Sequence, residues 1–165
     1  MPTSLPVPIE FRLPPEWLPA SPEGFDASDV SFAAVHPRPD AGFTANITID
    51  GEFRPDAATL AELADESVER LREVAGEVVV ANRHEVGSAD DPALTQQLTF
   101  SVVVGGTRRD LVQSQVYLSM SDIEDPHRRA VIRLSLTATA AQHDSVRGDF
   151  QDFVRTVRPD TRAGI

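Results

Sequence analysis

Four consecutive segments with a period of two follow one another without an intervening helix, and they constrain the fold more than any other feature of this chain. They are EVVVANRHEV (77–86), ALTQQLTFSVVV (93–104), DLVQSQVYLSM (110–120) and RAVIRLSLTAT (129–139). Alternation of apolar and polar residues is typical of strands with one buried face. The joints SADDP, GGTRR and SDIEDPHR have the composition of turns. The segments therefore predict a four-stranded antiparallel meander.

Two further segments have the periodicity of amphipathic helices. The first, DAATLAELADESVERLREVAG (56–76), has Asp56 as its expected N-cap and Gly76 as its expected stop. The second lies near the end of the chain, where one stripe contains Val146, Phe150, Phe153, Val154 and Val157. Valine runs at 78–80 and 102–104 indicate strands covered on both faces, so we expect one helix on each face of the sheet.

Three shorter strand-like segments precede the first helix. They are IEFRL (9–13), DVSFAAVH (29–36) and FTANITID (43–50), and the last alternates cleanly, with Asp50 on its outward face. We expect residues 1–8 to be an extended lead-in, 9–158 one domain and 159–165 a loose tail. The predicted fold class is α+β: an antiparallel sheet of six to seven strands flanked by two helices, in the order βββ-α-ββββ-α.

The composition excludes several kinds of site. The 165 residues carry a formal net charge of −11, all fifteen basic residues are arginines, and cysteine is absent. Disulfides, thiolate metal sites and lysine Schiff bases are therefore excluded. The acidic balance predicts no binding to nucleic acid or to an anionic membrane. The stretch MPTSLPVPIEF lacks a signal-peptide pattern, and no apolar run is long enough to span a membrane, so we expect a cytoplasmic protein.

The stretch His143-Asp144-Ser145 contains the three residue types of a hydrolase triad. Neighbours on a helix point about 100° apart, so these three side chains cannot converge on one substrate atom. We interpret them as the polar first turns of the second helix, which Thr139 or a neighbour would cap. The sequence thus predicts no catalytic residue; the alternative is a hydrolase that uses His84 or His127 with a distant serine or acid.

The histidines and the most acidic loop predict neither a metal nor a cofactor. His36, His84, His127 and His143 lack the spacing that holds an ion from one element. The loop SDIEDPHRR (121–129) lacks the spacing of a calcium-binding loop, so we expect a solvated turn. His84 shares a strand face with three valines, which predicts a histidine in the core or at its rim.

Two features are candidates for contacts with a partner protein. On the acidic face of the first helix we select Glu62, Glu66, Glu69 and Glu73, which would attract a basic partner. The second candidate is Trp17, the only tryptophan, because exposed aromatic side chains often anchor interfaces. The alternative for Trp17 is that it closes one end of the core. Open strand edges also allow a homodimer.

The order of elements resembles the PsbP-like superfamily. The resemblance rests on FRLPPEW (11–17), on a strand pair that leads into an amphipathic helix, and on the strand-threonine-helix unit IRLSLTATAAQHDSVRGDFQDFVRTV (132–157). Within the superfamily, which includes a Ran-binding release factor and DcrB-type proteins, the chain is most similar to the actinobacterial LpqN-type branch, although it lacks the lipobox cysteine. The resemblance implies an antiparallel sheet between helices and a non-enzymatic binding or accessory role.

We therefore expect a non-enzymatic protein-binding module, an adaptor or a chaperone-like accessory protein. Its contacts would use the Trp17 loop and a sheet face or edge left open between the helices. The alternative is a carrier of a small apolar ligand, with a pocket between the sheet and the Trp17 loop.

Overall fold

The structure is a computed structural model that describes residues 9–21, 30–40, 42–54, 58–87, 92–121 and 129–159. Nine strands and two helices occur within these ranges. In chain order they are β1 (Ile9–Glu10), β2 (Leu18–Ala20), β3 (Val30–Val35), β4 (Asn46–Phe53), α1 (Leu60–Ala75), β5 (Val78–Gly87), β6 (Pro92–Val104), β7 (Thr107–Ser121), β8 (Arg129–Thr139), α2 (Ala140–Thr156) and β9 (Arg158–Pro159). Neither helix is long and apolar enough to cross a membrane, within the residues described.

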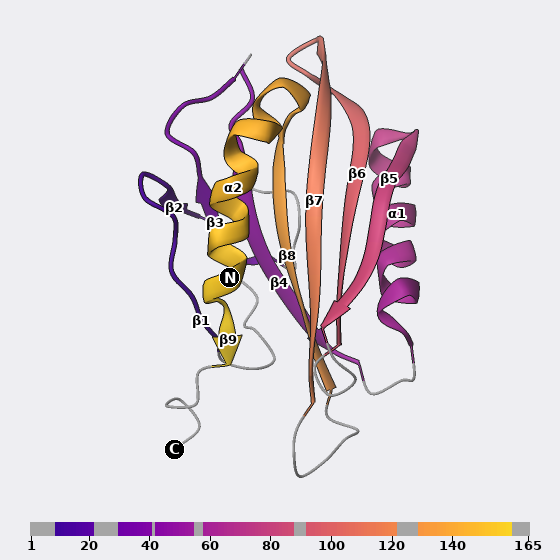
Figure 1. Ribbon diagram of the computed structural model, residues 1–165. Helices are drawn as coiled ribbons and strands as arrows, with labels where there is room; N and C mark the ends of the chain where they lie inside the picture. Colours follow the sequence, from indigo (N-terminus) through magenta and orange to yellow (C-terminus); the bar gives the residue numbers. More distant parts are fainter. Residues whose placement is uncertain are drawn as a thin grey trace.

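Seven of the strands form one antiparallel sheet in the order β2-β3-β4-β8-β7-β6-β5 (Figure 1). The predicted meander is confirmed, because β5, β6, β7 and β8 are neighbours in chain order. β8 returns to the middle of the sheet and pairs there with β4, from Asn46 opposite Thr137 to Phe53 opposite Ala130. The predicted α+β class with an antiparallel sheet and two helices is confirmed.

The N-terminal strands differ from the prediction. IEFRL does not join the main sheet; only Ile9 and Glu10 form a strand, and they pair with β9 near the end of the chain. The seventh strand is instead β2, in a proline-rich stretch that we expected to be a loop. The period of two in IEFRL is nevertheless correct, because Ile9, Phe11 and Leu13 all pack against the same core.

Helix α2 covers the middle of the sheet on one face. Phe150 and Phe153 are buried against a core formed largely by Ile132, Leu134 and Leu136 of β8. Strand β4, which pairs with β8, contributes Ile47 and Ile49 to the same core. This face therefore holds the largest apolar cluster of the described residues.

Helix α1 lies on the opposite face, over β5, β6 and β7. Its Leu60, Leu63 and Ala64 pack against Val131, whose side chain alternates with those of Ile132 and Leu134 and so points away from α2. A second cluster farther along the helix joins Val68 to residues of β5 to β7: Val78, Leu98, Phe100 and Leu111. The two helices therefore cover opposite faces and opposite halves of the sheet (Figure 1).

The expected cover on both faces is wrong at the β5 end of the sheet. Val78 is buried, but Val79 and Val80 are 50% and 36% exposed, and Val103 at the end of β6 is 72% exposed. Val79 and Val103 lie on the face opposite α1, which α2 does not cover at this end of the sheet, whereas Val80 lies on the α1 face at the open edge. An apolar run therefore marked an uncovered edge here.

Threonines cap both helices. The Thr59 hydroxyl accepts a hydrogen bond from the backbone N–H of Glu62 at 3.1 Å, and that of Thr139 accepts one from Gln142 at 3.2 Å. The prediction of Thr139 is confirmed. For α1 the N-cap is Thr59; the expected cap, Asp56, lies outside the described residues. Gly76 ends α1 as predicted, with a φ of 81° that favours glycine.

Replacing Thr59 by alanine should lower the free energy of unfolding by about 1 kcal/mol, because the N–H of Glu62 loses its acceptor. Urea denaturation measures the change, and Thr59→Ser, which keeps the hydroxyl, is the matched control. If Asp56→Ala lowers the free energy of unfolding and Thr59→Ala does not, the N-cap is Asp56, as expected from the sequence, and not Thr59.

Candidate functional site

The two edges of the main sheet are very different. At one end lies β2, only three residues long and interrupted by Pro19, which cannot donate a backbone hydrogen bond. At the other end lies β5, ten residues long, which pairs only with β6 among the described strands. Long free edges offer backbone groups to another chain. We call helix α1, strand β5 and the turn between them the α1–β5 side.

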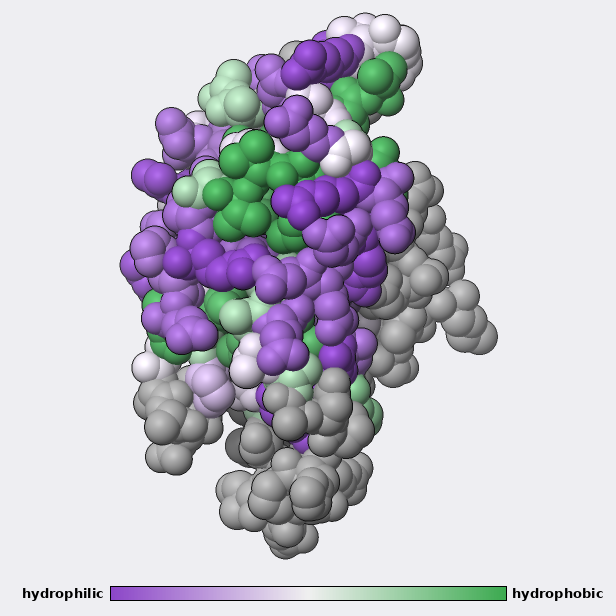
Figure 2. Space-filling model, turned by 90° about the vertical axis from the view of Figure 1, so that its right-hand side faces the viewer, coloured by the Kyte–Doolittle hydropathy of each residue, from purple (hydrophilic) through white to green (hydrophobic). Residues whose placement is uncertain are grey.

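Apolar side chains gather on the α1–β5 side. Figure 2 looks onto this side and shows apolar atoms in its upper half within a hydrophilic rim. The exposed large apolar residues of α1 and β5 are Val74, Val79, Val80 and Val86. Apolar surface on an open strand edge is typical of a place where another chain binds.

The acidic residues predicted to bind a partner all lie on α1 and are exposed, but two of them already have partners. Both carboxylate oxygens of Glu66 accept hydrogen bonds from Arg54, at 3.1 Å each. Glu69 pairs with Arg72 at 2.5 Å. Glu62 and Glu73 form no ion pair with any described residue, so they are the two members of the predicted set whose charge stays uncompensated by a direct contact.

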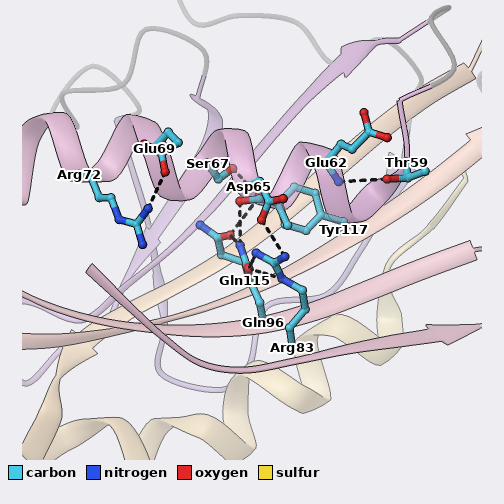
Figure 3. A network of polar contacts seen from close by, with 11 residues as sticks. Thr59, Glu62, Asp65, Ser67, Glu69, Arg72, Arg83, Gln96, Gln115 and Tyr117 are labelled. Atoms are coloured by element: carbon cyan, nitrogen blue, oxygen red, sulfur yellow. Dashed lines mark hydrogen bonds and ion pairs between the residues drawn. The ribbon is translucent and has the colours of Figure 1, made fainter. Parts of the chain in front are cut away.

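A polar network fastens α1 to β5 beneath this surface (Figure 3). Asp65 of α1 accepts a hydrogen bond from Nη1 of Arg83 on β5 at 2.8 Å. The same guanidinium donates through Nε and Nη2 to Oε1 of Gln96 on β6, at 3.0 and 2.8 Å. The amide of Gln96, which is buried, donates to Gln115 Oε1 on β7 at 2.6 Å. The network thus holds the helix and the edge strand in one arrangement.

The network continues to the centre of the sheet. Arg133 of β8 donates through Nε and Nη2 to Asp50 Oδ2, at 2.9 and 2.6 Å, and through Nη1 to the hydroxyl of Ser67 on α1 at 2.8 Å. Ser67 is also hydrogen-bonded to Tyr117, whose hydroxyl donates to Gln115 Oε1 at 3.0 Å. Asp50, predicted to face outward, is therefore buried because its face of the sheet lies under α1.

The charges of this network are stabilised by one another. Burial opposes the charged form of Arg133, but the carboxylate of Asp50 and the hydroxyl of Tyr117 together outweigh it and raise the pKa of the guanidinium. Burial raises the pKa of the Tyr117 hydroxyl, which stays neutral as a hydrogen-bond donor. No residue pattern in the sequence indicated these contacts, of which the one between Asp50 and Arg133 joins positions 83 residues apart.

Trp17 is not an exposed anchor. Its side chain is 4% exposed and belongs to the core under α2, its indole N–H donates to Asp149 Oδ2 at 3.0 Å, and its ring meets that of His36 edge-on at 5.2 Å. The structure thus agrees with the alternative, in which Trp17 closes one end of the core.

The cleft beside Trp17 does not match the expected apolar pocket. It has a volume of about 540 Å³ and lies between the segment before β2, the β3–β4 connection and α2. Its lining is largely charged and polar: Glu16, His36, Arg38, Asp40, Gln142, Ser145 and Asp149. Such walls favour water over an apolar ligand.

The triad residues point to different partners. His143 is 3% exposed, and its Nε2 lies 2.9 Å from the hydroxyl of Ser114 on β7, a pair that the sequence did not indicate. The hydroxyl of Ser145 instead donates to the carbonyl of Gln142 at 2.7 Å, and Asp144 is exposed. Burial lowers the pKa of His143. Adjacent positions on α2 therefore do not form a triad.

The other predicted site residues are dispersed. His84 is exposed on β5, so a core position is wrong; the bulge between Val80 and Asn82 shifts the alternation that the prediction used. His127 and most of the loop 121–129 lie outside the described residues. Within the described ranges, no group of three or more histidine, aspartate or glutamate side chains could hold a metal ion.

Comparison with known proteins identifies the fold. No family model and none of the curated proteins matches the sequence. Among solved structures, LpqN of Mycobacterium tuberculosis, involved in cell envelope biogenesis, superimposes with a TM-score of 0.62 at 16% identity, over 92% of this chain and 83% of that chain. The Ran-binding protein Mog1p of Saccharomyces cerevisiae gives 0.62 at 16% identity, over 92% and 89%.

Cyanobacterial PsbP from Synechocystis sp. PCC 6803 gives a TM-score of 0.60 at 14% identity, over 96% of this chain and 90% of that chain. All three have the PsbP-like fold, which confirms the fold that the resemblance implied.

Replacing Asp50 by alanine should lower the free energy of unfolding by about 3–5 kcal/mol, because it leaves the buried charge of Arg133 without its carboxylate. Urea denaturation measures the loss. The double variant Asp50→Leu/Arg133→Met is the matched control and should recover most of it, since apolar pairs often replace buried ion pairs. A change below about 0.5 kcal/mol for Asp50→Ala would contradict the role of this pair.

Stability should fall as the pH decreases below about 6.5. The unfolded chain then takes up a proton at position 143, whereas the native state, with its lowered pKa, does not, so protonation favours unfolding. Urea denaturation between about pH 5 and pH 7.5 should show a smaller pH slope for His143→Asn than for the wild type. His84→Asn, at an exposed position, is the control, and an unchanged slope in His143→Asn would disprove the assignment.

Proposed function

We propose that this protein is a non-enzymatic protein-binding module, an adaptor or chaperone-like accessory protein, that binds its partner on the α1–β5 side. The observation that carries the proposal is the contrast between the two edges of the sheet. β2 is short and contains Pro19, whereas β5 offers ten residues and exposed valines. An interface needs such a surface to be accessible and rigid, and the Asp65–Arg83–Gln96 contacts supply the rigidity.

The structural neighbours support the same class of function. Mog1p is a Ran-binding protein, and LpqN is involved in cell envelope biogenesis. Proteins with one fold can have unrelated functions, so this support is by analogy. The kind of partner has to be inferred from the surface of this chain itself.

The contacts of the polar side chains also favour binding over catalysis. The Ser114–His143 pair has the residue types of a nucleophile and a base. His143 is buried, however, and among the described residues no carboxylate or other group forms a hydrogen bond with its second ring nitrogen. A catalytic base needs an orienting group and access to substrate. The pair is better explained as a polar contact that holds α2 against β7.

A substitution on the edge strand tests the proposal. Tagged wild-type protein and Val79→Glu are used to capture proteins from a lysate of the source organism, with quantitative mass spectrometry as the readout. A charge at this exposed position should reduce recovery of a specific partner by about tenfold or more without unfolding the protein, because the buried interface loses apolar contact.

Two further variants complete the experiment. Leu18→Glu is the matched control: Leu18 is 55% exposed on the opposite edge, and recovery should not change. Glu62→Arg/Glu73→Arg reverses the two uncompensated charges of α1 and should reduce the recovery of a basic partner. If every protein retained by the wild type is retained equally by Val79→Glu, or if the wild type retains none above background, the proposal is wrong.

A further inference from the structure

The free edge of β5 has two sections. A bulge at Ala81 shifts the register between Val80 and Asn82, and it separates an apolar section, Val78–Val80, from a longer section, residues 82–87. Bulges on edge strands limit indiscriminate pairing. The section after the bulge still offers six residues in one register with β6, from Asn82 opposite Gln97 to Gly87 opposite Pro92.

The two faces of this edge differ in chemistry. On the face of α1, Glu85 is exposed and has no ion-pair partner among the described residues, while the charge of Arg83 is directed inward to Asp65 and Gln96. On the other face, His84 and Val86 lie opposite small residues of β6, Thr95 and Ala93. The α1 face of the edge is therefore acidic, and the opposite face is neutral and partly apolar.

Helix α1 extends the acidic character of its face. Its residues 60–75 contain five acidic and two basic side chains, a net charge of −3, and Glu77 follows in the turn before β5. Asp65 and Glu66 are paired with Arg83 and Arg54, whereas Glu62, Glu73 and Glu77 form no ion pair with a described residue. A chain beside β5 would therefore meet negative potential along its α1 face.

A second copy of this chain fits the edge poorly. Antiparallel pairing of two β5 strands about a two-fold axis would continue the sheet and place both α1 helices on the same face. Two acidic helices would then be neighbours in a complex of two chains that each carry a net charge of −11. Repulsion between like charges opposes this arrangement.

Near the start of β5, the face opposite α1 is hollowed. A cleft of about 320 Å³ lies there, with apolar walls that include Val79, Val112 and Ala140 and with Arg108 and Asp110 at its polar side. Arg108 and Asp110 contact each other at 3.5 Å, so their charges are compensated. Glu77 also lines the cleft and adds an acidic group to its wall, so the cleft suits a side chain with an apolar stem, projecting from a segment that runs along the edge.

We propose that β5 accepts an extended basic segment of a partner protein as an additional strand, with lysine or arginine at the positions facing α1 and apolar residues at the alternate positions. Main-chain hydrogen bonds to the edge would hold the segment, and opposite charges beside Glu85 would set its register. This inference rests on the proposed function, since it names the kind of partner that the α1–β5 side binds.

Synthetic peptides test the inference on the full chain. The probe is a blocked octapeptide of alternating valine and lysine, used at concentrations where sedimentation shows it to be monomeric. One control has glutamate in place of lysine, and a second has four valines followed by four lysines, with the same composition and charge. Fluorescence anisotropy should give binding of the alternating basic peptide about tenfold or more tighter than that of either control.

Hydrogen exchange locates the peptide. Binding should slow the exchange of backbone amides within residues 78–87, because outward N–H groups gain acceptors. Glu85→Arg should weaken the peptide roughly three- to thirtyfold. Asp144→Arg, the same charge change at an exposed position of α2, should alter it by less than about twofold.

Each other outcome overturns the inference. Absence of binding, equal binding of the block peptide, or protection outside β5 would exclude an added basic strand. Protection of β5 that depends on protein concentration without peptide would show that a second copy occupies the edge. In any of these cases, loss of a captured partner in Val79→Glu would leave the proposed function standing, with a partner of different shape. Conversely, peptide binding to β5 without any such partner would refute the proposed function alone.

Discussion

The width of the sheet relative to two helices is the constraint on which the rest of the structure depends. Seven strands at about 4.8 Å spacing span roughly 30 Å, whereas a helix with its side chains is about 10 Å across. One helix therefore cannot cover a whole face. Helix α2 covers the β4–β8 centre on one face, α1 covers β5 to β7 on the other, and each leaves the far half of its face to other segments or to solvent. The accessible edge at β5 follows from this arrangement.

Polar contacts determine how α1 is seated. One apolar cluster lies under the first turns of the helix, around Leu63, and a second lies under its later turns, from Val68 onward; the network of Ser67, Tyr117 and Arg133 lies beside them. Hydrogen-bonded buried groups tolerate few alternative arrangements, because each broken contact leaves a donor or acceptor without water. The acidic face of α1 and the edge of β5 consequently form one rigid surface, which would lower the entropic cost of binding an extended segment.

Proteins that share the fold have different roles: Mog1p binds Ran, and LpqN is involved in cell envelope biogenesis. The buried sheet and helices are common to them, so what distinguishes this chain must lie in its exposed features. Here those features are basic residues that are all arginines, a net charge of −11, and an edge strand with exposed valines before its bulge. The edge strand lies at the border of the sheet, where backbone groups and side chains remain available.

Local patterns in the sequence were sufficient for the helices, the four-strand meander and the cap at Thr139, because alternation, amphipathicity and capping depend on residues a few positions apart. They also marked the acidic face of α1. They left open whether Trp17 is exposed or buried, and they could not predict that Asp50 meets Arg133, that Ser114 meets His143, or that Val79 is exposed. Each of these depends on which strand lies beside which and where a helix ends its cover. Pairing between distant segments sets that order, and a period of two is the same on a covered face and an open one.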